Sequence, residues 1–150
     1  MMIDKAKIRR PVGVSARRTT HQLTKIYDEA LKPTGLTITQ FGLLAFLYGA
    51  TLDGKTWLSR HALAEFTGIH SSSLSRHQKL LRARGWVTCI AGAADRRKHT
   101  VSITTKGRVR LQRAVPFWRL AQAQTRDLLG VETNEALSMI LSLTFARLKK

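Results

Sequence analysis

Residues 60–79 carry a spacing of side chains that only a few arrangements of two short helices can satisfy. With Arg60 as position 1, five positions match what a tight helix crossing needs: Leu63, Ala64, Gly68, Ile69 and Leu74. Such a crossing requires a small residue at the contact, a permissive residue in the turn, and apolar anchors beneath both helices. Position 18 departs from the pattern, because His77 stands where an apolar residue is expected. The spacing predicts a helix–turn–helix, with an unrelated helical hairpin as the alternative.

Strand patterns follow this helix pair directly. Two segments rich in β-branched and aromatic residues, 86–90 and 100–104, are separated by a polar loop, which predicts a β-hairpin. A helix pair followed by a hairpin is a winged helix–turn–helix. Apolar residues at helical spacing predict further helices over 16–32, 38–48 and 105–129, and a last amphipathic stripe from Leu137 to Leu148.

The helix over 38–48 has a clear start signal. Thr37 and Gln40 have the spacing of a capping box, in which each side chain bonds the other residue's backbone N–H. The helix is apolar almost all round, so we expect it at the centre of the fold, ending near Gly49.

We therefore expect a mainly α fold with a small β-hairpin, in which a winged helix-turn-helix lobe is joined to a helical dimerisation region. The lobe covers about 55–104, and the dimerisation helices cover about 16–32 and 105–149. These helices carry more apolar surface than one small lobe covers, which favours a homodimer. Residues 16–150 are expected to form a single domain, and residues 1–15, without periodicity, a flexible basic N-terminal arm.

Positive charge is concentrated in one part of the chain. The 150 residues contain 26 Lys and Arg against 9 Asp and Glu, a net charge of +17. Residues 59–110 hold eleven basic groups and two acids, whereas residues 19–58 hold three of each. A local excess of this kind favours a face that binds a polyanion over a generally solvated basic surface.

Several classes of protein are disfavoured. No nucleotide-binding glycine motif or zinc-protease motif is present, so we expect no enzymatic activity, no cofactor and no metal. Cys89 is the only cysteine, which rules out an intrachain disulfide; without a neighbouring cation in the sequence, we interpret it as structural. The longest uncharged stretch, 33–52, is too polar for a bilayer, and no apolar run follows the basic N-terminal residues. We therefore expect no membrane association, no secretory signal peptide and a cytoplasmic location.

The second helix of the pair begins with four serines in five positions. Hydroxyls and helix N–H groups bond phosphates and base edges, and small side chains let a helix approach DNA closely. One serine is expected to cap the helix. In the alternative interpretation, the serines serve only as caps and Arg76 is only solvated, so that neither contacts DNA. The loop of the hairpin carries three cations in a row, suited to a minor groove, beside an aspartate that can orient an arginine. The candidate DNA-binding residues are Ser71, Ser72, Ser73, Ser75, Arg76, Lys79, Asp95, Arg96, Arg97 and Lys98.

Three motifs resemble one known family. Residues 36–44 (LTITQFGLL) are similar to the "LTxxQxxLL" opening of the second helix in MarR-type regulators. Residues 72–76 and 84–87 resemble the recognition helix and its exit in that family. Asp95-Arg96-Arg97 and residues 101–107 (VSITTKG) resemble its D-x-R wing and "VSLTxKG" return strand, which is the most specific part. The resemblance covers roughly residues 16–149. His77 and Gln78 depart from it, because they stand where the family usually has apolar residues.

The resemblance implies a homodimer whose winged lobes each read one half of a palindromic operator in double-stranded DNA. Arg97 would enter the minor groove, braced by Asp95. It also implies a transcriptional regulator, a repressor relieved by a small aromatic or anionic ligand. Tyr27, Phe46 and Trp118 are the candidate ligand-lining residues, although aromatic residues at helical spacing are also typical of plain core. The alternative function is a constitutive, sequence-tolerant nucleic-acid-coating or architectural protein without ligand gating.

Overall fold

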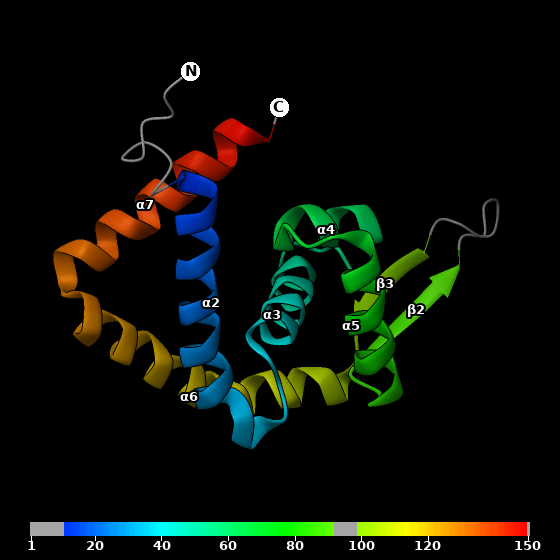
Figure 1. Cartoon of the computed structure of the whole chain (residues 1–150). Helices are drawn as coiled ribbons and strands as arrows, with labels where there is room; N and C mark the ends of the chain where they lie inside the picture. Colours follow the sequence, from blue (N-terminus) through cyan, green and yellow to red (C-terminus); the bar gives the residue numbers. More distant parts are fainter. Residues whose placement is uncertain (1–10, 92–98, 150) are drawn as a thin grey trace. The chain divides into compact units, whose positions relative to one another are not determined.

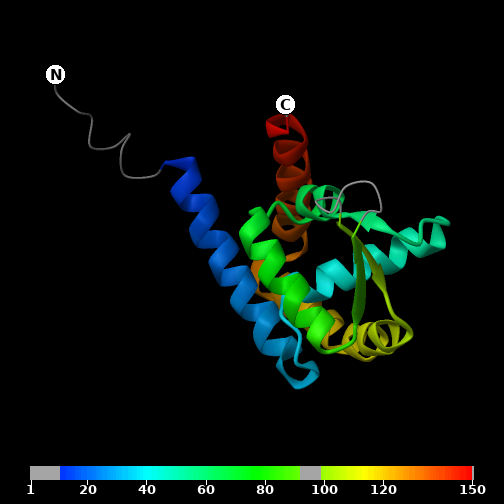
Figure 2. The ribbon, with the colours of Figure 1, turned by 90° about the vertical axis from the view of Figure 1, so that its right-hand side faces the viewer.

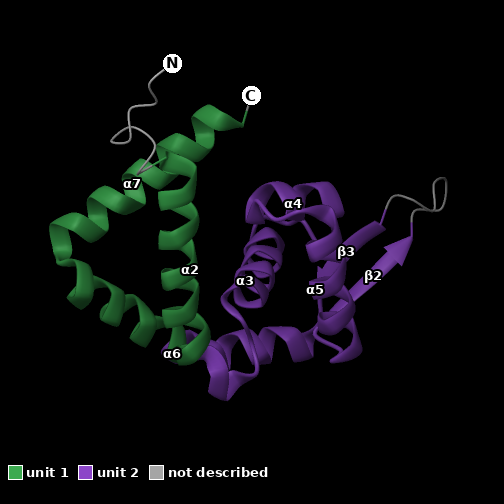
Figure 3. Ribbon diagram, in the orientation of Figure 1, with its two compact units in different colours: residues 1–30, 117–150 green, residues 31–116 purple. Residues whose placement is uncertain are grey.

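The computed structural model describes residues 11–91 and 99–149 (Figure 1). The chain divides into two compact units (Figure 3). Residues 31–116 form unit 2, and residues 1–30 together with 117–150 form unit 1. Helix α6, Thr105–Leu129, belongs to both units, because the division falls just after Pro116 within an unbroken helix.

Unit 2 has the winged helix–turn–helix architecture that the sequence predicts. Its elements, besides the first half of α6, are η1 Lys32–Thr34, α3 Ile38–Leu52, β1 Leu58–Ser59, α4 Arg60–Thr67, α5 Ser71–Ala83, β2 Val87–Ala91 and β3 His99–Ile103. The hairpin of β2 and β3 gains β1 as a third antiparallel strand, in the order β1-β3-β2. Val101 pairs with both Leu58 and Cys89, so β3 is the central strand.

Helix α3 lies in the core of unit 2, as its all-apolar sequence predicts. The capping box is present: Gln40 N donates to Thr37 Oγ1 at 3.3 Å, and Thr37 N donates to Gln40 Oε1 at 3.1 Å. Leu43, Leu44 and Leu47 are almost fully buried. The predicted end at Gly49 is wrong, because α3 continues to Leu52 and is capped by Asp53, whose N–H donates to the Gly49 carbonyl.

The helix–turn–helix has the predicted internal geometry. Gly68 adopts a φ of 65° and its N–H donates to the Ala64 carbonyl at 2.8 Å, which ends α4 and turns the chain toward α5. Leu63 and Leu74 are each 1% exposed and anchor the two helices. His77, which stands where the helix–turn–helix pattern expects an apolar residue, is half-buried. The neighbouring Gln78 is buried in its place. The polar side chain is therefore accommodated at the edge of the core.

Unit 1 contains three helical segments. They are α2 Val12–Leu31, the second half of α6, and α7 Val131–Leu148. The Tyr27 hydroxyl donates to Gln122 Oε1 at 2.9 Å and links α2 to α6. Helix α2 begins at Val12 rather than at the expected Ala16, because the Pro11 carbonyl accepts bonds from the N–H groups of the first turn. The rest of the expected N-terminal arm lies outside the described residues.

Helix α7 has an apolar sequence but no buried residue among its eighteen, all of which the structure describes. Its exposed apolar side chains include Met139, Ile140, Leu141, Leu143, Phe145 and Leu148. Across the described residues, no single helix is both long and apolar enough to cross a membrane.

Candidate nucleic-acid interface

The N-terminal half of α5 presents a polar and basic face to solvent. All six residues predicted on this helix are exposed: Ser71, Ser72, Ser73, Ser75, Arg76 and Lys79. Their spacing along a 3.6-residue turn puts Ser72, Ser75, Arg76 and Lys79 on the face opposite the buried Leu74 and Leu81, with Ser71 and Ser73 at its two margins. Figure 2 shows α5, in bright green, running across the front of unit 2.

The cap of α5 differs from the expectation that one serine caps the helix. His70 is the N-cap residue: its Nδ1 accepts a bond from Ser72 N at 3.4 Å and lies 2.9 Å from Ser72 Oγ. The hydroxyl of Ser75 donates to the Ser71 carbonyl at 2.9 Å. Within the described part of the chain, the Ser71 and Ser73 hydroxyls form no hydrogen bond. Capping therefore does not explain the run of serines.

Arg60 belongs to this face, although the sequence marked it only as the first position of the motif. Its Nη2 donates to the hydroxyl of Ser75, so α4 places a guanidinium beside the serines of α5. A hollow of about 450 Å³ separates the two helices, lined by Arg60 and His61 of α4 and by serines of α5. Among the described residues that line it, none is acidic. The lining of this hollow therefore offers hydroxyl and guanidinium donors, while the carboxylate of Glu65 lies beside it, with Oε1 3.9 Å from His61 Nε2.

The wing is built by β2 and β3, whose last paired residues before the tip are Ala91 and His99. The four candidate residues of the tip, Asp95, Arg96, Arg97 and Lys98, lie outside the described residues. At the base of the wing, a second hollow of about 210 Å³ is lined by Arg60, Lys79, Arg82, Cys89 and His99, among others. The basic face of α5 thus continues to the described end of the hairpin.

Cys89 lies half-buried in β2, and the expectation that no cation is near it is wrong. Burial raises the pKa of its thiol above the ordinary 9.0, and the charges of Arg82 and Arg60 oppose this rise. Packing brings these arginines from α5 and α4, which their sequence distance from Cys89 conceals. Because burial is the larger effect, the thiol is not activated. Of the described residues, no group of His, Cys, Asp and Glu could hold a metal ion.

The three aromatic residues proposed for a ligand are distributed over both units. Tyr27 and Trp118 belong to unit 1, and Phe46 belongs to unit 2. Phe46 of α3 stacks on Phe66 of α4, with ring centroids 3.9 Å apart and planes 4° from parallel. Phe66 could not be predicted as a partner of Phe46, because it lies half-exposed at the end of a short helix.

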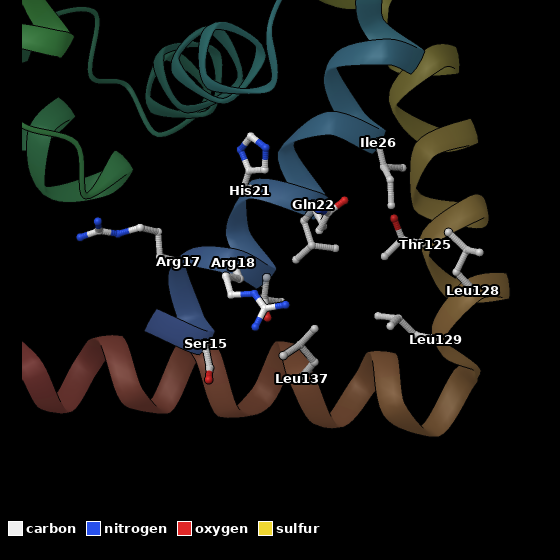
Figure 4. A pocket seen from close by; sticks show the side chains of 12 residues that line it. Ser15, Arg17, Arg18, His21, Gln22, Ile26, Thr125, Leu128, Leu129 and Leu137 are labelled. Atoms are coloured by element: carbon white, nitrogen blue, oxygen red, sulfur yellow. The ribbon is translucent and has the colours of Figure 1, made fainter. Parts of the chain in front are cut away.

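Unit 1 has an apolar pocket of about 700 Å³ that the sequence did not predict (Figure 4). It is lined from α2, α6 and α7, and its apolar side chains include Ile26, Leu128, Leu129 and Leu137. Figure 4 shows Leu129 and Leu137 facing the pocket, whereas Arg17 points away from them.

Comparison with known proteins identifies the family. The model of the MarR family matches residues 34–98. The transcriptional regulator MosR of Mycobacterium tuberculosis, solved in complex with DNA, is 33% identical, with a TM-score of 0.72 over 91% of this chain and 97% of that one. This chain belongs to the MarR family.

Two further solved structures support the same fold. Bordetella bronchiseptica BpsR is 25% identical, with a TM-score of 0.73 over 89% of this chain and 97% of that one. The DNA-bound repressor CouR is 23% identical, with a TM-score of 0.74 over 96% of this chain and 99% of that one. No curated protein matches the chain.

The return-strand motif of this MarR-family chain has a structural role at the junction of β3 and α6. Thr104 Oγ1 donates to the Gly85 carbonyl at 2.6 Å and accepts a bond from Gly107 N at 3.0 Å. Thr104 N donates to the Trp86 carbonyl at 3.1 Å. These bonds fasten the exit of α5 to the start of α6 and so fix the base of the wing.

Proposed function

We propose that this MarR-family chain is a sequence-specific DNA-binding transcriptional regulator that places α5 in the major groove. The observation that carries the proposal is the exposed face of α5, where serine hydroxyls and Arg76 stand clear of the core with no acid among them. A major groove admits one α-helix and distinguishes all four base pairs. The DNA complex of MosR, at 33% identity, supports this function. We infer a cytoplasmic location because the proposed partner is chromosomal DNA.

Each group on this face has a proposed part. Arg76 is suited to a bidentate bond to the O6 and N7 atoms of guanine, while the serines bond base edges or phosphates. Arg60 and Lys79 contribute positive charge beside the groove. In the wing, Arg97 is proposed to enter the minor groove, with Asp95 orienting it by a charge-assisted bond.

The proposal includes a homodimer on a palindromic operator. Helix α7 exposes a continuous series of large apolar side chains, which a monomer in water would leave uncovered. The apolar pocket of unit 1 adjoins α7 through Leu137 and enlarges this surface. A second copy of the chain is the proposed occupant, since a two-fold interface needs a patch that complements itself.

We further propose that the chain is a repressor and that a small aromatic or anionic ligand relieves the repression. BpsR supports it, because that protein's DNA binding is regulated by 6-hydroxynicotinic acid. Tyr27, Phe46 and Trp118 are the proposed lining residues. A ligand relieves repression only if it binds the DNA-incompetent state more tightly than the competent one. Titrating aromatic carboxylates against the protein–DNA complex tests this, and a ligand that binds while DNA affinity stays unchanged contradicts it.

The experiment that tests DNA specificity is competition at physiological salt. Labelled DNA from beside the protein's own gene is competed with unlabelled copies of itself and with bulk DNA. A specific regulator is displaced by its own site at concentrations at least ~1,000-fold lower than by bulk DNA. Equal displacement by both competitors supports the nucleic-acid-coating alternative, because counterion release alone is insensitive to sequence.

A further inference from the structure

A basic hollow in unit 2 is not used by the proposed DNA face. It has a volume of about 510 Å³ and is lined in part by the buried Trp86, which follows the C-terminal end of α5. We name it the Trp86 pocket. Its lining comes from the loop after α2, the exit of α5 and the first turns of α6, and its basic residues are Lys32, Arg84, Lys106 and Arg110.

Two guanidinium groups are held in place against the indole. The Cζ atoms of Arg84 and Arg110 each lie 4.9 Å from the centroid of the Trp86 ring. Arg84 Nη1 donates to the Gly35 carbonyl at 2.7 Å, and Arg110 Nη1 donates to the Thr34 carbonyl at 3.0 Å. An arginine has five N–H donors, so each guanidinium keeps further donors for a ligand. Their positions are thus fixed before any ligand arrives.

Three cations of the Trp86 pocket, Arg84, Arg110 and Lys106, have no carboxylate among the residues that line it with them. Lys106 adds an ammonium group beside Gly85, within the same hollow as the two arginines. Of the described residues that line the pocket, none is an Asp or a Glu. Stacking on Trp86 favours each cation individually, but it leaves their mutual repulsion in place. A bound anion would relieve that repulsion.

We propose that the Trp86 pocket binds the phosphate group of a small molecule. A phosphate carries up to two negative charges and several acceptor oxygens, which match two guanidinium forks and an ammonium group better than a single carboxylate does. DNA offers phosphate as well. However, the pocket lies at the opposite end of the 13-residue helix α5 from Ser71, about 20 Å along its axis. A freely diffusing phosphate compound is therefore the source that the geometry favours.

The test is calorimetric titration of the full chain with inorganic phosphate, against chloride at constant ionic strength. We expect saturable binding at one site per chain. Lys106→Gln removes one exposed cation of the pocket and should weaken phosphate binding roughly tenfold. Lys55→Gln makes the same change of charge at an exposed loop position outside the pocket, and should leave binding unchanged. Thermal melting of both variants checks that the fold is kept.

Arg110→Lys tests whether phosphate binding depends on the planar guanidinium group of Arg110 or only on its charge. It keeps the positive charge but loses the planar group that stacks on Trp86 and bonds Thr34, so we expect weaker phosphate binding here too. Absence of saturable binding, or equal weakening in Lys106→Gln and Lys55→Gln, overturns the proposal. One further result overturns the proposal. If the free protein binds no phosphate and Lys106→Gln lowers DNA affinity in the absence of phosphate, the pocket binds the DNA backbone and not a small molecule.

Discussion

Gly107 is the position at which the backbone leaves no room for a side chain. A Cβ atom there would lie 2.0 Å from the Trp86 carbonyl oxygen and 2.9 Å from Ile103 Cγ1. We expect Gly107→Ala to lower the free energy of unfolding by about 3 kcal/mol, because backbone must move to admit the methyl group. Urea denaturation measures this change.

Gly42 supplies the matched control, since a Cβ atom in its place would meet nothing within 4 Å in the interior of α3. Gly42→Ala is expected to stabilise the chain by roughly 0.5–1 kcal/mol, through reduced entropy of the unfolded state. If Gly107→Ala unfolds at the same urea concentration as the wild type, the close approach of α6 to Trp86 is contradicted.

The thiol of Cys89 is predicted to react slowly at neutral pH. Burial raises its pKa above 9.0, so the thiolate fraction is smaller than in an unfolded chain. A raised pKa in the folded state adds stability that is fully present below about pH 9 and is lost as the pH rises through the folded pKa. The rate of reaction with a thiol reagent should rise with pH and reach half of its plateau value only above pH 9.0, where an unshifted thiol is half ionised.

Arg82→Gln tests the effect of a neighbouring charge on the reactivity of Cys89. The charge of Arg82 lowers the pKa of Cys89, so its removal should raise that pKa further and slow the reaction. A faster reaction in Arg82→Gln, or a folded wild type as reactive as the unfolded chain at pH 7, contradicts this assignment.

Helices α4 and α5 show how far local spacing predicts an element. The turn at Gly68 and the anchors Leu63 and Leu74 were predictable, because their residue types are required wherever two short helices cross. The cap was not, because any short side chain near the start of α5 can accept the free N–H, and His70 does so before a serine. Helix ends at Val12 and Leu52 were missed for a similar reason.

Contacts between distant elements were beyond prediction from the sequence. The stack of Phe46 on Phe66, and the two arginines that flank Trp86, join residues that local periodicity cannot relate. Arg60 was missed for the same reason, because its place in the proposed DNA-binding face depends on its bond to Ser75. The serines and Arg76 were predictable as a group, since they lie within six residues of one helix and their exposure follows from its apolar stripe.

The wing is predicted to contribute to DNA affinity through an arginine and its aspartate. Arg97→Ala should weaken specific binding by roughly 1–3 kcal/mol. Asp95→Ala should weaken binding by a similar amount, although it removes a negative charge, because Arg97 loses its orienting partner. Binding to an operator fragment, measured at fixed salt, checks both variants. Tighter binding by Asp95→Ala would show that the aspartate only repels DNA.

The whole molecule is predicted to be a homodimer in which α7 is covered. Obligate interfaces of this kind bury upward of ~2,000 Å². Light scattering at micromolar concentration should give the mass of two chains, and Leu141→Glu should shift it toward one, because an unpaired charge would be buried. Leu52→Glu, at an exposed apolar position of α3, should leave the dimer intact. A monomeric wild type contradicts the prediction.

Reading of DNA sequence by α5 is tested most directly with Arg76→Gln, measured on an operator fragment and on random DNA at the same salt concentration. Arg76 is exposed on the face of α5 that we place in the major groove, so its loss should weaken operator binding by roughly 1–3 kcal/mol. Binding to random DNA should fall only by the small contribution of one charge. An equal loss of affinity on both DNAs would contradict sequence reading by this helix.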